Sequence, residues 1–142
     1  MSQIAQGIAI YPAHRDAKAA LRWVAEHAEG YSINMDYLTV GGGSSGAITS
    51  VGVSVTDPGD FRDELSELED PTILTTHLDQ DYAVRTILDF WGSRTSVDLL
   101  QGGYDVERFD LNDPPLFITH GTADSTVIFS NALLLQDTRE SI

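Results

Sequence analysis

The sequence predicts an α/β fold, a parallel sheet of about three strands with flanking helices. Short segments rich in β-branched and aromatic residues alternate along the chain with segments whose apolar residues recur at helical spacing. The chain has 142 residues, 42% of them hydrophobic, which is enough for one buried core. Because strands that alternate with helices form a parallel sheet covered by those helices, we expect a single domain over residues 1–142.

The first predicted helix follows the segment YPAHRD. From Asp16 to about residue 28, apolar residues recur every three or four positions, which gives a helix one buried face. Asp16 suits the first turn of this helix and Gly30 suits its end. The next segment, YLTV at 37–40, is short, aromatic and β-branched, and we expect it to form a buried strand.

A glycine-serine turn follows this strand. Beyond the turn, Ile48, Val51 and Val55 lie at helical spacing and predict a second helix, although alternate residues of the same segment also fit a strand. The region after this helix is acidic and irregular, and we expect a short helix in it at 61–68.

The second half of the chain predicts two more strands and a last helix. Apolar segments predict strands at 86–90 and 116–120. Ser130 is a suitable N-cap for a helix at 131–139, in which three side chains are available for burial: Ala132, Leu133 and Leu135.

Composition excludes several classes of site and partner. The chain has no cysteine, so disulfides, thiolate catalysis and zinc-thiolate sites are excluded. Its net charge of -14 repels nucleic acid and anionic membrane surfaces, and no apolar run approaches the roughly 20 residues of a membrane helix. The N-terminus lacks the features of a signal peptide, so we expect a cytoplasmic protein. Lys18 is the only lysine, which fits either a salt-adapted protein or an ordinary acidic one.

The glycine-serine turn contains the motif G-x-S-x-G at residues 42–46. In this motif a strand turns sharply into a helix, and a strained serine, here Ser44, lies at the apex. We expect the flanking glycines to leave no room for a Cβ where the helix meets the strand. The backbone N–H of Ser45 would lie at the helix N-terminus, where it can stabilise an oxyanion. Ser45 is the rival nucleophile, but its own frame ends in Ala47.

A second candidate residue, Asp124, lies in the segment HGTADSTV. This segment follows a predicted strand, so Asp124 is expected at the carboxyl end of the sheet, where parallel sheets assemble their sites. An acid in this position can orient a histidine and stabilise the imidazolium that forms when serine loses its proton. The alternative is an Asx turn or a helix cap.

These two segments resemble the α/β-hydrolase superfamily, specifically bacterial carboxylesterases and lipases of the hormone-sensitive-lipase-like kind. The resemblance is carried by YPAHRDAKAALRWVAEHAEGYSINMDYLTVGGGSSGA and PPLFITHGTADSTVIFSNALLL, with VRTILDFWG as a weaker match between them. It implies a partial α/β-hydrolase fold, truncated to its central portion. It also implies a small-molecule ester substrate, no cofactor or metal, Ser44 as nucleophile, Asp124 as triad acid and the Ser45 amide as an oxyanion donor. The reaction implied is ester hydrolysis through an acyl-serine.

The chain departs from the family pattern at the catalytic base. Relatives place it after the acid, but no histidine follows Asp124. Three candidates for the base stay open: His77 in the irregular loop, His14, or a histidine from another subunit. His14 and His27 also fit packing or capping roles, and His120 fits a structural one. The His-Gly-Gly-Gly-type loop of the family is also expected to be absent.

Two further expectations follow from this reading. A central portion of a sheet has two open edges, so we expect a homo-oligomer formed by strand addition or swapping. With the base unidentified, a catalytically impaired remnant that acts as a binding or assembly module is the alternative function. A phosphate site at the glycine turn is a weaker alternative, because the lysine of a P-loop is missing.

Overall fold

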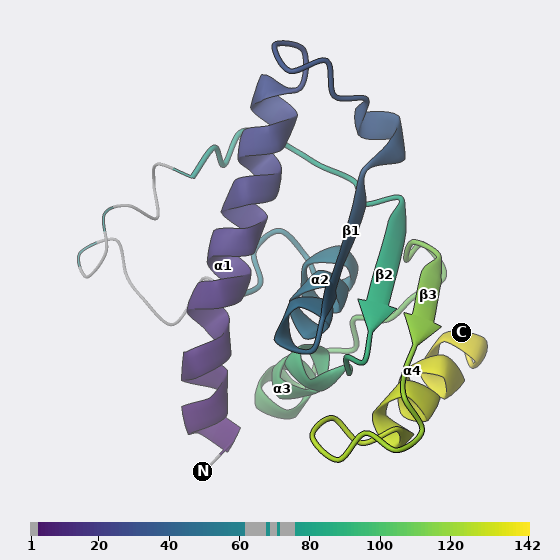
Figure 1. Ribbon diagram of the computed structural model, residues 1–142. Helices are drawn as coiled ribbons and strands as arrows, with labels where there is room; N and C mark the ends of the chain where they lie inside the picture. Colours follow the sequence, from purple (N-terminus) through teal and green to yellow (C-terminus); the bar gives the residue numbers. More distant parts are fainter. Residues whose placement is uncertain (1–2, 62–67, 69–70, 72–75) are drawn as a thin grey trace.

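The computed structural model describes residues 3–61, 68, 71 and 76–142 (Figure 1). Its elements in chain order are α1 (Gln3–His27), the 3₁₀ helix η1 (Met35–Tyr37), β1 (Thr39–Gly43), α2 (Ser45–Val55), β2 (Thr86–Phe90), α3 (Thr95–Tyr104), β3 (Leu116–Thr119) and α4 (Ser130–Glu140). The short helix expected at 61–68 falls largely on residues 62–67, which lie outside the described residues.

The three strands form one parallel sheet in the order β1-β2-β3. Ile87 at the centre pairs with Val40 on one side and with Leu116 on the other. Parallel neighbours require crossovers, and α2 and α3 lie in the two connections. The predicted α/β class, with about three parallel strands and flanking helices, is confirmed.

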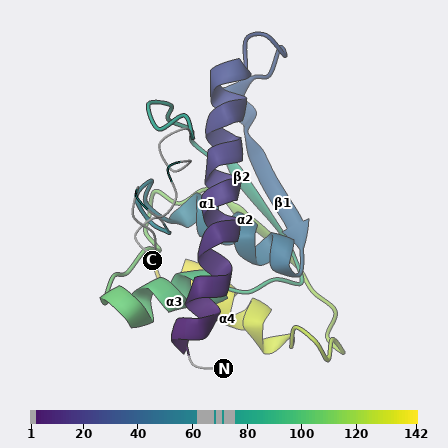
Figure 2. The ribbon, with the colours of Figure 1, turned by 90° about the vertical axis from the view of Figure 1, so that its left-hand side faces the viewer.

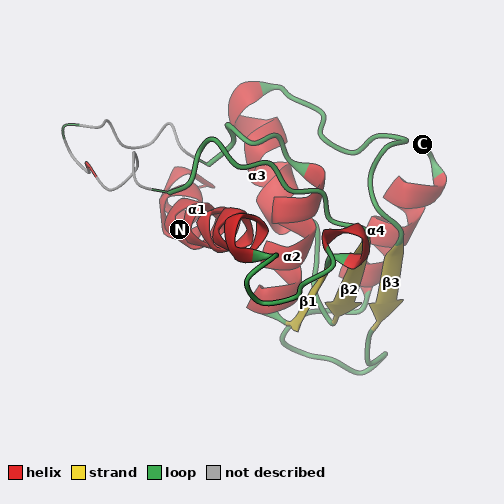
Figure 3. Ribbon diagram, turned by 90° about the horizontal axis from the view of Figure 1, so that it is seen from above, coloured by secondary structure: helices red, strands yellow, loops and turns green. Residues whose placement is uncertain are grey.

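The helices lie on one side of the sheet, as the view along the strands shows (Figure 3). Helix α1 runs almost the full height of the molecule against this layer (Figure 2). The core between the helices and the sheet consists of Val51, Val55, Val84, Ile87, Val97, Phe109 and Leu135. The same side of β2 carries Asp89, which is also buried.

The other face of the sheet is partly open. Phe117 of β3 points to this face and 56% of its surface is exposed. Parallel sheets are ordinarily covered on both faces, so an exposed aromatic residue at this position is unusual. None of the described helices combines the length and the apolar character that a membrane span needs.

Helix α1 begins at Gln3, which corrects the predicted start at Asp16. Pro12 lies inside the helix, although proline removes a backbone donor there. Tertiary packing offsets this cost, because the neighbouring Tyr11 is buried and its ring meets that of Phe61 edge-on at 5.3 Å.

Strand β1 lies further along the chain than predicted. Residues 35–37 form η1, where the Asn34 side chain accepts the N–H of Asp36, and Tyr37 is exposed instead of buried. The strand then includes Gly41, whose added Cβ would lie 2.7 Å from the Cβ of Leu88. Glycine is required at position 41 because β2 packs too closely there for a side chain.

Two helices correct the prediction in the second half. Helix α3 was not predicted, because its glycine-containing sequence suggested a polar loop, yet Val97 and Leu100 are buried one turn apart. Helix α4 lies where predicted, but Ser130 is its first residue and not its N-cap. Leu133 is exposed, unlike the other two residues expected to be buried. The strands at 86–90 and 116–119, and the helix that includes residues 48–55, are confirmed.

Candidate active site

Ser44 joins β1 to α2 in a strained backbone conformation. Its φ is 55° and its ψ is -121°, a combination that L residues rarely adopt and that costs about 1–3 kcal/mol. The N–H of Ser44 donates to the carbonyl of Phe90 at 3.0 Å, and its own carbonyl accepts the N–H of Ile48 at 3.1 Å. These bonds hold the residue between β2 and α2. Its side chain is half-buried and makes no capping hydrogen bond to the helix.

The two glycines of the motif differ in what the fold requires. A Cβ on Gly42 would lie 2.7 Å from the backbone carbon of Gly46, so the strand side of the turn has room only for glycine. A Cβ on Gly46 would meet nothing within 4 Å. The expectation that both flanks exclude a side chain is therefore wrong at Gly46.

Ser45 is the first residue of α2. The first amides of a helix have no acceptor inside the helix and carry the positive end of its dipole. The Ser45 N–H belongs to this group and directly follows the strained Ser44. This position can stabilise negative charge that develops beside the Ser44 hydroxyl.

Asp124 lies in the loop after β3. One carboxylate oxygen, Oδ1, accepts the N–H of Thr126 at 2.8 Å and that of Val127 at 3.0 Å. These two hydrogen bonds lower the pKa of Asp124, and the bond from Thr126 has the larger effect. The other oxygen, Oδ2, is 3.9 Å from Nε2 of His120. Asp124 thus forms an Asx-type turn through one oxygen and is favoured in its charged form.

The sheet places Ser44 and Asp124 beyond the carboxyl ends of its strands. Ser44 follows β1, Asp124 follows β3, and the central strand β2 lies between them (Figure 1). Neighbouring strands are about 4.8 Å apart, so the two strand ends are roughly 10 Å apart. Asp124 lies five residues beyond the end of β3, in the loop that follows it.

None of the four histidines has a described hydrogen bond or ion pair with Ser44. His14 is buried, and its Nδ1 donates to the carbonyl of Ile10 at 3.0 Å. His27 bonds the carbonyl of Trp23 through Nδ1 at 2.8 Å. His77 forms an ion pair with Glu26 near the end of α1. It precedes β2 and so lies toward the amino edge of the sheet, opposite Ser44. His120 follows β3, and its Nε2 donates to the carbonyl of Val127 at 2.6 Å.

Sequence reasoning missed Asp89, which lies near the carboxyl end of β2. Only 1% of its surface is exposed. Burial raises its pKa, against the hydrogen bond from Gly92 and the charge of His120, which lower it. The signal was present in the sequence, because an acidic residue interrupts the apolar run TILDF.

Trp91 also lies at this edge. Its φ of 50° is unusual for a bulky residue, and its N–H donates to the carbonyl of Thr119 at 2.8 Å. A Cβ on Gly43 would lie 2.7 Å from the Trp91 ring, so the indole packs on the strand directly before Ser44. The ring is 46% exposed and can form one wall beside the serine.

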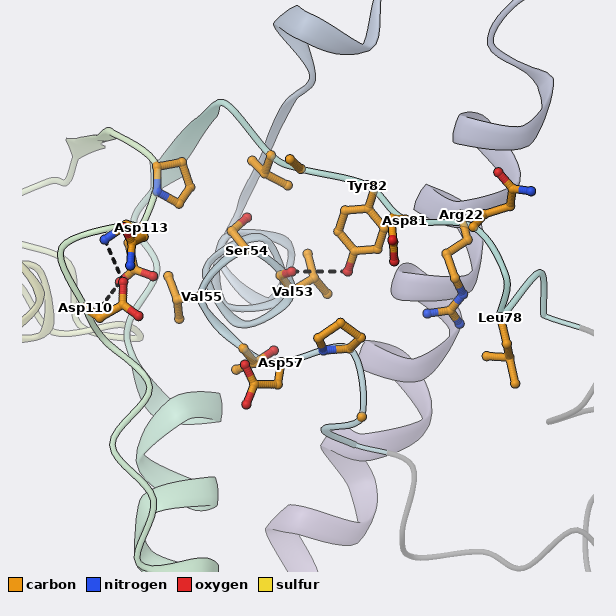
Figure 4. A pocket seen from close by; sticks show the side chains of 18 residues that line it. Arg22, Val53, Ser54, Val55, Asp57, Leu78, Asp81, Tyr82, Asp110 and Asp113 are labelled. Atoms are coloured by element: carbon orange, nitrogen blue, oxygen red, sulfur yellow. Dashed lines mark hydrogen bonds between the residues drawn. The ribbon is translucent and has the colours of Figure 1, made fainter.

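A cavity of about 360 Å³ lies away from this edge (Figure 4). Its lining comes from the end of α2 and from the segments that precede β2 and β3, which is the amino side of the sheet. Tyr82 donates to the carbonyl of Val53 at its wall, and Arg22 and Asp57 line it as well. Neither Ser44 nor Asp124 lines this cavity, so it has no part in the candidate site.

Comparison with known proteins gives one family match. The family model BD-FAE, a domain of the α/β-hydrolase and esterase type, matches residues 4–104, well over half of the chain. The match includes Ser44 and Asp89 and ends before Asp124. No curated protein and no solved structure matches the chain.

Proposed function

The chain belongs to the BD-FAE family, and on this basis we propose that it is a carboxylic ester hydrolase with Ser44 as its nucleophile. The observation that supports the assignment of Ser44 is its backbone. A non-glycine residue with a positive φ, between a parallel strand and a helix, is the geometry of a nucleophile elbow. Hydrogen bonds to Phe90 and Ile48 hold this backbone in place.

In the proposed reaction the Ser44 oxygen attacks the ester carbonyl and passes its proton to an imidazole. The alcohol leaves with that proton, and an acyl-serine remains. Water then attacks the acyl group and releases the carboxylic acid. The Ser45 N–H stabilises the oxyanion in both steps, and Asp124 orients the imidazole through its Oδ2.

We propose that the imidazole comes from a second copy of the chain. This is supported by the hydrogen bonds and ion pairs described for the four histidines, none of which includes Ser44. It is also supported by the free edge of β3, where Leu116 and Ile118 line a groove together with Arg139 of α4. Unpaired strand edges associate readily, so a homo-oligomer could bring a partner's histidine to this side of the sheet.

Labelling with a fluorophosphonate probe tests the nucleophile. We expect covalent labelling of the wild type and its complete loss in Ser44→Ala. The matched control is Ser45→Ala, which removes the neighbouring hydroxyl but keeps the backbone N–H, and which should label at nearly the wild-type rate. Labelling that survives in Ser44→Ala and disappears in Ser45→Ala would contradict the assignment.

Light scattering and the concentration dependence of labelling test the second copy. We expect a dimer or larger species at micromolar concentration, and a labelling rate per molecule that rises as the oligomer forms. Phe117→Lys should weaken association, because a charge beside an edge strand opposes pairing. Leu111→Lys, at a more exposed apolar position in a loop, is the control. A stable monomer with an undiminished labelling rate would contradict the proposal that a second copy supplies the imidazole.

The alternative is a binding or assembly module without catalysis. It would show the same association, but the wild type would not react with the probe. For the ester hydrolase, the proposed substrate is a small-molecule ester. A cytoplasmic location stays a prediction.

A further inference from the structure

Trp91 lies next to Ser44 where the strands end. The pairing between β1 and β2 ends at Gly43 and Phe90, and the residues that follow are Ser44 and Trp91. The N–H of Ser44 donates to the carbonyl of Phe90 at 3.0 Å, which continues the parallel ladder beyond that last pair. Trp91 is therefore the neighbour of the proposed nucleophile on the adjacent strand.

Both of these neighbours have a strained backbone. The φ is 55° at Ser44 and 50° at Trp91, and a bulky residue rarely adopts a positive φ. Such strain persists only where the surrounding structure holds it, and it is concentrated at functional sites. The N–H of Trp91 donates to the carbonyl of Thr119 at 2.8 Å, so β3 holds Trp91 as β2 holds Ser44.

The positive φ turns the indole onto the open face of the sheet. Asp89, two residues earlier in β2, points toward the helices, and regular alternation would send residue 91 the same way. A Cβ on Gly42 would meet α2, so a Cβ on Gly43 would point away from the helices, and it would lie 2.7 Å from Cζ2 of Trp91. The ring therefore covers Gly43 on the open face, directly before Ser44.

The indole is a fixed apolar surface that remains accessible. Its Cε2 and Cη2 would lie 3.1 Å and 3.3 Å from the same Cβ on Gly43, so one edge of the ring packs on the strand. The Phe90 ring is 6.4 Å away between centroids. Yet 46% of the Trp91 surface is exposed. A rigid aromatic ring that is open to solvent beside a nucleophile offers apolar contact to a bound molecule.

We propose that Trp91 determines the specificity of the esterase, and that the apolar chain of a bound ester lies along its indole. This inference rests on the proposed function. Consecutive Cα atoms are about 3.8 Å apart, so a chain that leaves the carbonyl at Ser44 needs only a few methylene groups to reach the ring over Gly43. The substrate class is therefore esters with an unbranched apolar chain of about six carbons, on the acyl or the alcohol side, in preference to methyl acetate.

Three variants distinguish this contact from a general loss of structure. Trp91→Ala removes the apolar surface, and Trp91→Phe keeps a smaller aromatic one. The matched control is Trp23→Ala, because Trp23 is similarly exposed at 41% and its ring stacks on His27 of α1. Trp23 and Trp91 are the two tryptophans of the chain.

The ratio of kcat/KM between long and short esters is the first readout. Methyl hexanoate and hexyl acetate are each compared with methyl acetate. In Trp91→Ala we expect the ratio to fall about tenfold for one or both long esters, because one or two methylene groups lose their contact. Trp91→Phe should give a smaller fall, and Trp23→Ala the wild-type ratio. The ester that is affected shows whether the chain lies on the acyl or the alcohol side. Unchanged ratios for both in Trp91→Ala would overturn the proposal.

The fluorescence of Trp91 is the second readout. In the double variant Ser44→Ala and Trp23→Phe, Trp91 is the only indole and the proposed nucleophile is absent. We expect its emission to shift to the blue when methyl hexanoate or hexyl acetate displaces water from the ring, and to stay unchanged with methyl acetate at the same concentration. No shift with either long ester would overturn the proposal.

The fluorescence measurement also separates this inference from the proposed function. If the wild type neither hydrolyses esters nor reacts with the fluorophosphonate, the proposed function fails, while the emission of Trp91 still decides whether its indole binds an apolar chain. The measurement keeps Trp91 itself, so it decides the question even if Trp91→Ala does not fold.

Discussion

Lys18 shows how far a single residue can depart from what its type suggests. As the only lysine in the chain it marks a lysine-poor, acidic composition, but its side chain is fully buried. The ammonium donates to the carbonyl of Asp57 and lies 5.3 Å from the centre of the Phe61 ring. Burial lowers its pKa to about 8. Lys18 therefore joins α1 to the segment after α2, and it adds nothing to the charge of the surface.

A pH dependence of stability follows from this burial. Lys18 has a pKa of about 8 when folded and 10.5 when unfolded, so between these values the unfolded chain binds more protons. Stability from this group therefore rises with pH across that window. Relative to Lys18→Met, the wild type should gain up to about 3 kcal/mol in free energy of unfolding. Urea unfolding at several pH values checks this, and parallel curves for the two proteins would contradict it.

At the scale of elements, the junction between β1 and α2 determines the candidate site. The strand ends in glycines because β2 and α2 approach it closely, and the strained Ser44 is held by hydrogen bonds to both neighbours. The α2 amides then begin directly at Ser45. The position of the candidate nucleophile therefore depends on β1, β2 and α2 together. A change in any of these elements should alter the position of Ser44.

The two motif glycines give a matched test of this junction. Gly42→Ala places a Cβ against the Gly46 backbone and should destabilise the protein by about 1–3 kcal/mol. Gly46→Ala has open space and a helical backbone, so it should be neutral or stabilising by up to about 1 kcal/mol. Thermal unfolding of both variants compares them directly. Equal effects would mean that close packing does not explain the glycine at 42.

At the scale of the whole molecule, charge and the open sheet act in opposite directions. A net charge of -14 on 142 residues keeps copies apart, whereas the exposed Phe117 and the free edge of β3 favour contact between them. Salt screens the repulsion without weakening the apolar attraction. Both the stability and the association of the chain should therefore depend on ionic strength.

We expect the melting temperature to rise as sodium chloride is increased from about 0.01 M to 1 M, where the Debye length falls from about 30 Å to about 3 Å. The self-repulsion of the folded state is then screened. Calorimetry at low protein concentration separates the effect of screening on stability from the effect of association. A melting temperature independent of salt would argue for an ordinary acidic surface and against salt adaptation.

Much of the fold could be predicted because its signals are local. The apolar runs at 86–90 and 116–119 and the helical spacing at 48–55 lie where the structure has them. The errors occur where tertiary contacts override local preference. Pro12 lies inside a helix because Tyr11 packs against Phe61, and α3 forms despite its glycines because Val97 and Leu100 enter the core.

The sequence by itself determined the α/β class, the serine turn and the acid loop, because periodicity, glycine and motif spacing are properties of neighbouring residues. Only the tertiary structure decided which buried polar groups share one side of the sheet. Asp89 and His120 are 31 positions apart, and only strand pairing between β2 and β3 brings them to one side of the sheet. The same pairing sets Ser44 and Asp124 two strands apart at one edge, since parallel strands align their carboxyl ends.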